Sequence, residues 1–254
     1  RLYKNNGSLE FTRSIHEQLN KKSGDLIYGN IDLIIYHSGY LNKVVSDKNK
    51  NNRNTPLVKK ELGSKENAFD YFNLGNEFFS ANEIELALDS YKKAYMKKSQ
   101  FELSWIGITI IQIINCLLRL KRYNDALEVI KDAEKIWRET VDFKCLKANV
   151  YFNQYRFDDA KSELLDLINN KEKYTHCIFN VNFKDLYPHE MLATIYYQEK
   201  NYNEAVYHSV TALNYNKFNY QVITNLLFIL LQNESEQNIL LMIERLNWNK
   251  EEHI

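Results

Sequence analysis

Four alanines at matching positions limit the fold of this chain more than any other sequence feature. They follow one another at spacings of 39, 34 and 45 residues: Ala87, Ala126, Ala160 and Ala205. Nine positions before each alanine stands a large apolar residue, namely Phe78, Leu117, Tyr151 and Tyr196. Seven positions after it stands a small or apolar one, namely Ala94, Ala133, Leu167 and Ala212. A period of this length indicates stacked supersecondary units, because one unit alone cannot bury its apolar face.

The first copy carries the fullest pattern, which consists of Tyr71, Leu74-Gly75, Phe78, Ala87, Tyr91 and Ala94. A unit of about 34 residues with this order resembles the tetratricopeptide repeat (TPR), a pair of antiparallel helices. Helices approach to about 8–10 Å only where the facing side chains are small. We therefore expect Gly75 and Ala87 to face each other. The fold class that follows is mainly α, a TPR-type helical-repeat solenoid over residues 68–251.

Some parts of the array depart from this pattern. Ile114 takes the small position of the second unit, and Lys147 takes an apolar position in the third. An insertion of about eleven residues, which includes Lys171-Glu172-Lys173, precedes the fourth unit. Two further helical stretches, 218–231 and 235–248, are interpreted as a fifth, degenerate unit that caps about four regular ones.

Composition agrees with a helical protein and excludes several functions. The chain of 254 residues has seven glycines, two prolines and 13% aromatic residues, which argues against a turn-rich β-sandwich or a disordered chain. Lys+Arg and Asp+Glu both number 33, so we expect no nucleic-acid partner. The longest apolar run, 106–118, is too short to span a bilayer and predicts a buried helix. Three well-separated cysteines form no CxxC motif, which favours reduced thiols and a cytoplasmic location.

The position after the small residue of each first helix is a candidate peptide-binding position. It is Asn76, Asn115 and Asn149 in three units, and Thr194 in the fourth. First helices line the concave face of such arrays, and asparagine can both donate to and accept from a peptide backbone. The TPR resemblance also implies this role, since several peptide-binding families use asparagine there.

Aromatic residues one turn further along could add apolar contacts: Phe79, Phe152 and Tyr197. We therefore predict a peptide or protein partner in this groove. The alternatives are that asparagine is simply abundant in this chain and that the aromatic residues serve ordinary packing. A homodimer formed by the repeats also stays open.

The first fifty residues lack the repeat. Asn5-Asn6-Gly7-Ser8 predicts a turn, residues 9–15 predict a strand, and residues 31–36 predict a more buried strand. Two or three short strands bury too little to be stable alone. We interpret residues 1–45 as the end of a mixed domain and residues 46–67 as a linker with a short helix.

Several motifs in this segment carry a second resemblance. They are Arg1-Leu2-Tyr3-Lys4, the stretch 11–18, His37-Ser38-Gly39-Tyr40-Leu41, and Lys50-Asn51-Asn52-Arg53-Asn54. Together they resemble the C-terminal end of bacterial family-2 glycosyltransferases with a GT-A core, many of which continue directly into TPR repeats. Sublancin-type peptide S-glycosyltransferases share this layout. Ser38 departs from the pattern, because an aromatic residue is common there.

The resemblance implies sugar transfer from a nucleotide-sugar, with Mg²⁺ or Mn²⁺ holding the diphosphate. The family supplies metal ligands from an Asp-x-Asp motif, which this chain lacks together with the nucleotide-binding strands. We therefore expect this fragment alone to be inactive and to bind no cofactor. Since the chain begins at Arg1 and not at Met, the native N-terminus is expected upstream.

Three residues in the matched motifs are candidate catalytic groups: His16, Glu17 and His37. Either histidine could lie near the metal, and for each the alternative is a structural hydrogen bond. Two functions stay open. One is the C-terminal part of a glycosyltransferase whose repeats recruit a peptide or protein acceptor. The other is a stand-alone TPR scaffold for protein–protein interaction, or a peptide-sensing regulator.

Overall fold

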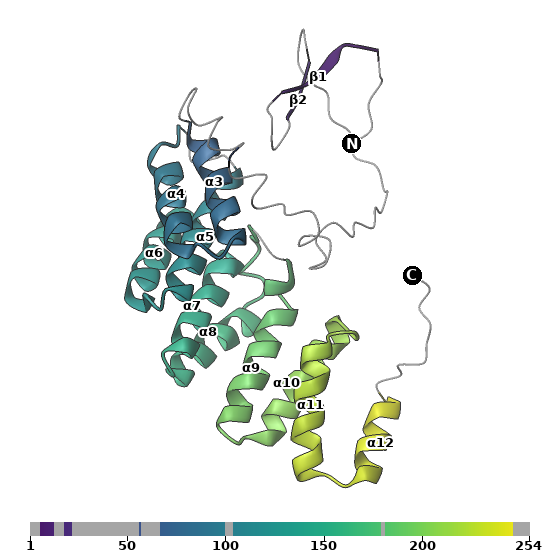
Figure 1. Cartoon of the computed structure of the whole chain (residues 1–254). Coiled ribbons are helices and arrows are strands. Elements are labelled where there is room, and N and C mark those ends of the chain that lie inside the picture. Colours follow the sequence, from purple (N-terminus) through teal and green to yellow (C-terminus); the bar gives the residue numbers. More distant parts are fainter. Residues whose placement is uncertain are drawn as a thin grey trace. The chain divides into compact units, whose positions relative to one another are not determined.

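The computed structural model describes residues 6–12, 18–21, 56, 67–99, 104–178 and 181–245. Within these ranges the chain is helical apart from one β-hairpin, a short 3-10 turn and the connections between helices (Figure 1). It divides into two compact parts, residues 1–120 and residues 121–254.

The described residues of the first part form a hairpin and three helices. Strand β1 (Leu9–Thr12) pairs antiparallel with β2 (Gln18–Lys21), so that Leu9 lies opposite Lys21. The strand predicted over 9–15 is thus present over its first four residues, whereas β2 was not predicted. The predicted strand at 31–36 and the predicted linker helix after Pro56 lie outside the described residues, as do His16, Glu17 and His37.

Helix α3 (Ala68–Ser80) pairs with α4 (Ile84–Met96), which packs in turn on α5 (Ser104–Arg119). The Asn67 side chain caps α3 by accepting a hydrogen bond from the Asp70 N–H at 2.9 Å. The long apolar run in α5 is a buried helix, as predicted, with Ile106, Ile110, Ile114 and Leu117 in the core.

The second part contains α6 (Tyr123–Ile136) and three antiparallel pairs. The pairs are α7 (Val141–Asn153) with α8 (Phe157–Asn169), α9 (Leu186–Gln198) with α10 (Tyr202–Tyr215), and α11 (Tyr220–Asn233) with α12 (Glu236–Arg245). A 3-10 turn, Val181–Phe183, precedes α9. The two terminal helical stretches predicted from sequence correspond to α11 and α12.

The repeat pattern predicts the core correctly. The four matching alanines are all fully buried, each one turn into its helix: Ala87, Ala126, Ala160 and Ala205. Five residues before each alanine, the connecting turn places a non-glycine residue in the left-handed region: Asn82, Lys121, Tyr155 and Lys200, with φ between 57° and 62°. These turns were not predicted, because glycine is the usual signal for that conformation.

The closest neighbour of Gly75 is a residue that was not predicted. A Cβ at Gly75 would come within 2.6 Å of the Tyr91 ring, so the side chain nearest to this glycine is Tyr91 and not Ala87. Tyr91 is fully buried, and its hydroxyl donates to Asn76 Oδ1 at 2.8 Å. The glycine therefore makes room for an aromatic ring between two helices.

The lysine at an apolar position of the third unit has an ionic explanation. Lys147 on α7 pairs with Glu163 on α8 at 2.6 Å, and Lys144, one turn earlier, pairs with the same carboxylate at 2.6 Å. All three side chains are half-buried or more. This cluster thus joins α7 to α8 where other units use apolar contacts.

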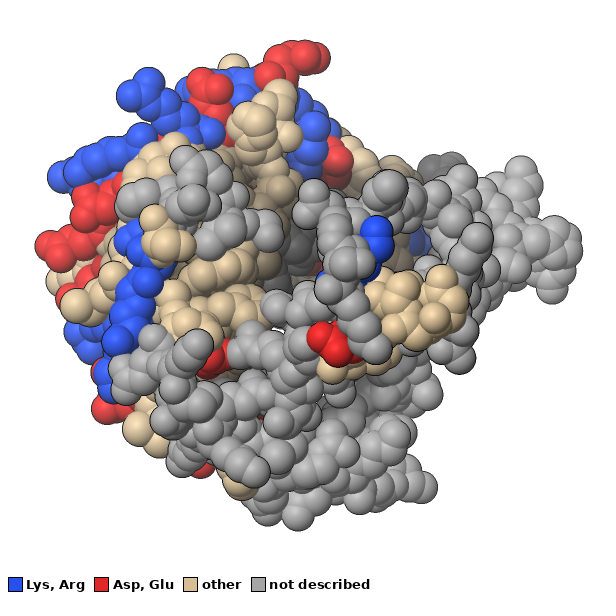
Figure 2. All heavy atoms as spheres, turned by 90° about the horizontal axis from the view of Figure 1, so that it is seen from above, with Lys and Arg blue, Asp and Glu red and all other residues tan. Residues whose placement is uncertain are grey.

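Surface charge is mixed. Among the described residues visible in Figure 2, lysine and arginine side chains alternate with aspartate and glutamate side chains over the same face. Of the helices described, none has the length and apolar character needed to cross a membrane.

We predict that Gly75→Ala destabilises the protein by about 1–2 kcal/mol, because its methyl group would overlap the buried Tyr91 ring. The sign of the change in unfolding free energy distinguishes this effect from helix propensity, since replacing glycine by alanine inside a helix ordinarily stabilises a protein by about 0.5–1 kcal/mol. Chemical denaturation measures the change, with Lys92→Ala at an exposed position of α4 as the control. Combining Gly75→Ala with Tyr91→Leu should cost less than the sum of the two single changes. Full additivity would show that the ring is not the obstacle.

A candidate peptide-binding pocket between α9 and α11

A pocket of about 290 Å³ lies between α9 and α11, with α10 contributing to its wall. In a helical-repeat array, each first helix neighbours the first helix of the next unit, and these helices together form the binding face. The pocket is therefore on the face where sequence analysis places a partner. Its lining residues are Glu190, Ala193, Thr194, Tyr197, Gln198, Ser209, Val222, Asn225, Phe228 and Ile229.

The walls of this pocket are largely apolar. Ala193 on α9 and Val222 and Ile229 on α11 are buried and belong to the core behind the pocket. Two aromatic side chains stay accessible to solvent: Tyr197 is 38% exposed and Phe228 is 58% exposed. Because Tyr197 comes from α9 and Phe228 from α11, an apolar group in the pocket would meet an aromatic residue from each of the two first helices.

The polar groups come mainly from α9. The Glu190 carboxylate accepts a hydrogen bond from the Asn219 side chain amide at the start of α11, and burial raises the pKa of Glu190. One turn later, the Thr194 hydroxyl donates to the Glu190 carbonyl oxygen at 3.0 Å. The Glu190–Asn219 bond joins the two helices that form the pocket.

Ser209 on α10 supplies a buried oxygen to the pocket. The residue is only 1% exposed, and its Oγ has no hydrogen-bond partner among the described residues. A buried hydroxyl without a partner costs about 1–3 kcal/mol, and native structures contain few of them. A bound group that donates a hydrogen bond to this oxygen would remove the cost.

Two buried histidines lie at the α9–α10 contact. The Nδ1 atoms of His189 on α9 and His208 on α10 are 2.8 Å apart, and the Tyr196 ring stacks on His208 at 5.5 Å. The pKa of each histidine is lowered to about 4; burial is the main cause for both, and the proximity of His208 contributes for His189. Both rings are therefore neutral at pH 7, so that one nitrogen donates and the other accepts.

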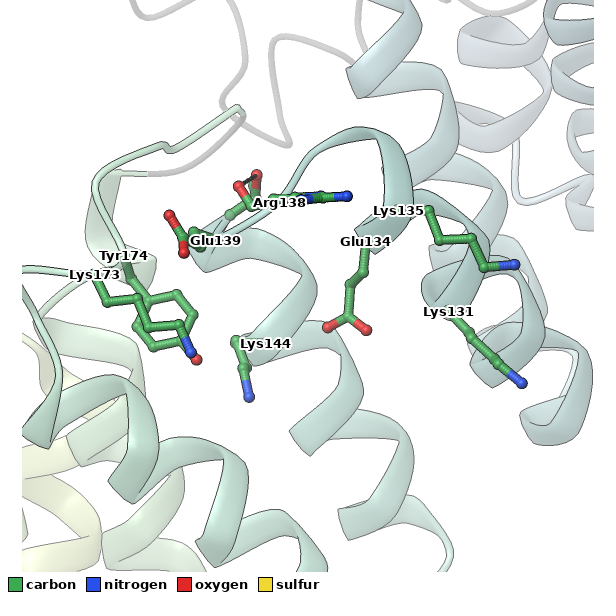
Figure 3. A pocket seen from close by; sticks show the side chains of 9 residues that line it. Lys131, Glu134, Lys135, Arg138, Glu139, Lys144, Lys173 and Tyr174 are labelled. Atoms are coloured by element: carbon green, nitrogen blue, oxygen red, sulfur yellow. Dashed lines mark hydrogen bonds between the residues drawn. The ribbon is translucent and has the colours of Figure 1, made fainter.

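A second pocket, of about 520 Å³, lies among the end of α6, the start of α7 and the insertion before α9 (Figure 3). Five of its lining residues are basic, namely Lys131, Lys135, Arg138, Lys144 and Lys173. Two glutamates offset this charge, and Figure 3 shows the Glu134 carboxylate between Lys144 and the pair Lys131 and Lys135.

The least exposed lysine of this second pocket is already paired. Lys144 contacts Glu163 at 2.6 Å and Asp166 at 2.9 Å. The Tyr174 hydroxyl also donates to Asp166, and this bond together with that from Lys144 lowers the pKa of Asp166 to about 2. A β-bridge between Thr140 and His176 holds the same insertion. The second pocket is thus built around ionic contacts that anchor the insertion to α7 and α8.

The predicted asparagines all make contacts within the chain. Asn76 accepts from Tyr91, as described above. Asn115 donates to Gln112 Oε1 at 3.1 Å, and Asn149 donates to the Tyr187 hydroxyl at 3.1 Å. Asn76 and Asn115 belong to the first compact part and Asn149 to the second, and none of the three lines the pocket between α9 and α11. A peptide-binding role for them stays a prediction.

The predicted aromatic residues differ from one another. The Arg119 guanidinium lies over the Phe79 ring at 4.4 Å, and Phe152 packs against Phe157 at 5.7 Å. Tyr197, by contrast, lines the pocket, together with Thr194 at the position equivalent to the asparagines.

Glu190 and Ser209 were not predicted from the sequence. Glu190 could have been found, because it precedes Thr194 by four residues and must share its helix face. Ser209 gave no sequence signal, since only the packing of α10 against its neighbours leaves its hydroxyl unpartnered. Within the described residues, no group of three or more His, Cys, Asp or Glu side chains could hold a metal ion.

The helical units define a TPR-type fold, and comparison with solved structures agrees with this. A thermophilic TPR protein of Thermus thermophilus is similar with a TM-score of 0.54 at 15% identity, over 74% of this chain and 94% of that one. A tetratricopeptide repeat protein from Parabacteroides merdae is similar with a TM-score of 0.55 at 14% identity, over 74% of this chain and 68% of that one. MamA is similar with a TM-score of 0.50 at 15% identity, over 71% of this chain and 95% of that one. At these identities the likeness concerns the fold alone. No protein-family model and no curated protein matches the chain.

We predict that stability falls as the pH drops from 7 to 5, because unfolding releases His189 and His208 to titrate near their ordinary value of 6.5. Their stabilising effect is complete above pH 6.5 and is lost as the pH falls towards about 4. The loss at pH 5 should be at least about 1 kcal/mol. Denaturant titrations at several pH values measure it. The double variant His189→Gln/His208→Gln should show a flatter profile, and an unchanged slope would assign the pH effect to other groups.

Proposed function

We propose that this chain is an interaction module whose repeats bind an extended segment of a peptide or protein partner, with the pocket between α9 and α11 as a principal contact. The observation that carries this proposal is the combination found there: apolar walls, two accessible aromatic residues and a buried unpartnered oxygen on the face made by successive first helices. Extended segments bind in this way by placing individual side chains in separate pockets.

The size of the pocket supports a side-chain ligand. Pockets for whole small molecules commonly measure about 300–1,000 Å³ and bury most of the ligand. A volume of about 290 Å³ between two helices suits one anchoring side chain of a longer segment. Tyrosine and phenylalanine are also enriched at protein interfaces relative to the rest of the surface.

We further propose that the partner is the acceptor of a glycosyltransferase, and that this array recruits it for sugar transfer from a nucleotide-sugar. Support comes from the motifs between residues 1 and 54, which resemble the end of a GT-A domain and stand in the same order relative to the repeats as in that family. A divalent metal and the nucleotide-sugar would be bound by a catalytic domain upstream. His16, Glu17 and His37 stay the candidate contributions of this chain to that site.

Two further expectations belong to this proposal. A cytoplasmic location is supported by the cysteines, which are all unbridged, two of them buried in repeat helices. Self-association of the repeats into a homodimer is compatible with the exposed apolar side chains of α11 and α12, such as Leu231, Leu240 and Leu241.

We predict that Tyr197→Ser weakens binding of a selected peptide about tenfold, because an accessible aromatic contact is lost from the pocket wall. Fluorescence polarisation with a labelled peptide from a random 12-residue library measures affinity, and thermal unfolding checks the fold. Tyr207→Ser removes an exposed tyrosine of α10 outside the pocket and should leave affinity unchanged. If the two variants bind alike, the pocket is not the contact. If the library yields no binder, peptide binding itself is refuted.

We predict that a polypeptide comprising this chain and its upstream sequence binds a UDP- or GDP-sugar in the presence of Mn²⁺ or Mg²⁺ and loses that binding in EDTA, since the diphosphate needs the metal. Isothermal titration calorimetry makes the measurement, with residues 1–254 alone as the control that should not bind. Absence of donor binding by the longer polypeptide would remove the glycosyltransferase proposal and leave the interaction module.

A further inference from the structure

The pocket between α9 and α11 has a one-sided charge. Of its ten lining residues, Glu190 is the only one with a carboxylate, and the lining contains no lysine, arginine or histidine. The histidines behind it, His189 and His208, are neutral at pH 7 and bond to each other. A ligand group in this pocket therefore meets a negative charge that no lining side chain balances.

Glu190 differs from three other partly buried carboxylates of the second compact part, each of which pairs with a lysine. Glu163 pairs with Lys144 and Lys147, Asp166 pairs with Lys144, and Glu199 pairs with Lys161 at 2.7 Å. Glu190 has the Asn219 amide as a hydrogen-bond donor and makes no ion pair with any described residue. A partly buried carboxylate without a cation is costly, so a cationic ligand would be favoured at this point.

Ser209 provides an independent observation. The residue lines the pocket, and its Oγ is buried and lacks a partner among the described residues. Together with the Glu190 carboxylate, it gives the pocket hydrogen-bond acceptors on two helices. Ammonium and guanidinium groups have only donors, three and five respectively. The unpartnered hydroxyl oxygen of Ser209 can accept a hydrogen bond from either group, so it is compatible with the cationic ligand that the Glu190 charge favours.

The remaining walls suit the rest of a basic side chain. Ala193, Val222 and Ile229 offer an apolar surface to the methylene groups, which lysine and arginine bury readily. Tyr197 and Phe228 are accessible on the two facing helices, and an aromatic face attracts a cation within about 6 Å of its centre.

We propose that the pocket between α9 and α11 binds a lysine or arginine side chain of the partner segment, with the Glu190 carboxylate as its counter-charge and Ser209 Oγ as a second acceptor. This inference rests on the proposed function, because it names the chemistry of the segment that the repeats bind. It also sets specificity: an aspartate or glutamate at the anchor position is excluded by charge repulsion with Glu190.

The test begins with the 254-residue chain and a random library of 12-residue peptides. Enriched peptides are synthesised, and each basic residue is replaced in turn by norleucine, which keeps the aliphatic stem, and by glutamate. We expect the enriched sequences to share a basic residue. Its replacement by norleucine should weaken binding at least tenfold, and replacement by glutamate should abolish it. This inference is overturned if the enriched peptides share no basic residue, or if norleucine replacement leaves their affinity unchanged. Peptide binding itself would then still be established. No enriched peptide overturns the proposed function itself.

The protein variants then locate the effect. Glu190→Gln keeps a polar group beside Asn219 but removes the charge. The basic peptide should therefore bind at least tenfold more weakly to this variant. The affinity of the norleucine peptide should not change. Glu204→Gln removes an exposed carboxylate at the start of α10 and is the matched control, with no expected change in affinity. If Glu190→Gln and Glu204→Gln weaken binding equally, only the net charge of the protein matters. That result would overturn the assignment of Glu190 as the counter-charge of the bound side chain.

Ser209→Ala keeps the test decisive where Glu190→Gln unfolds the protein. Because the hydroxyl has no partner in the free protein, its removal should leave the melting temperature unchanged or raise it. The same change should weaken the basic peptide at least threefold. Unchanged affinity in Ser209→Ala, together with full binding of the norleucine peptide, would overturn the proposal.

Discussion

Close contact between paired helices at a fully buried alanine is the constraint on which the array depends. Ala87, Ala160 and Ala205 are fully buried, so a larger side chain at any of them would overpack the core. The connecting turns enforce the same geometry, because each one reverses the chain within a few residues through a left-handed residue. The short turns and the small buried side chains together determine how the two helices of each pair pack. The surface that the first helices form follows from how those pairs stack.

Individual units satisfy this constraint with different chemistry. The first unit uses a glycine to admit the Tyr91 ring between its helices. The third uses Lys144 and Lys147 around Glu163, so that an ionic cluster takes the place of apolar packing and also holds the insertion through Asp166 and Tyr174. The fourth uses the bonded pair His189 and His208. Buried polar contacts of this kind are stable only when each member has a partner, and these clusters meet that condition.

The pocket between α9 and α11 contains polar side chains whose charge or hydrogen-bonding capacity is not matched by a partner. Glu190 lacks a cation and the Ser209 hydroxyl lacks a hydrogen-bond partner among the described residues, although both lie beside well-packed apolar residues. Incomplete satisfaction in an otherwise ordered core is expected at sites that bind something. The physical basis of the proposed function is therefore a local departure from the pairing that the ionic cluster and the histidine pair show.

The sequence by itself determined the repeat, the helix pairs, the buried run in α5 and the terminal pair α11 and α12, because these depend on residue size and spacing that repeat along the chain. It also singled out Thr194 and Tyr197, and both line the pocket between α9 and α11. Only the tertiary structure decided that Gly75 meets Tyr91, that the asparagines bond within the chain, and that Glu190 and Ser209 share a pocket. Those facts depend on which side chains from separate helices meet and on which polar groups are left unpartnered. Spacing along one chain carries no record of such contacts.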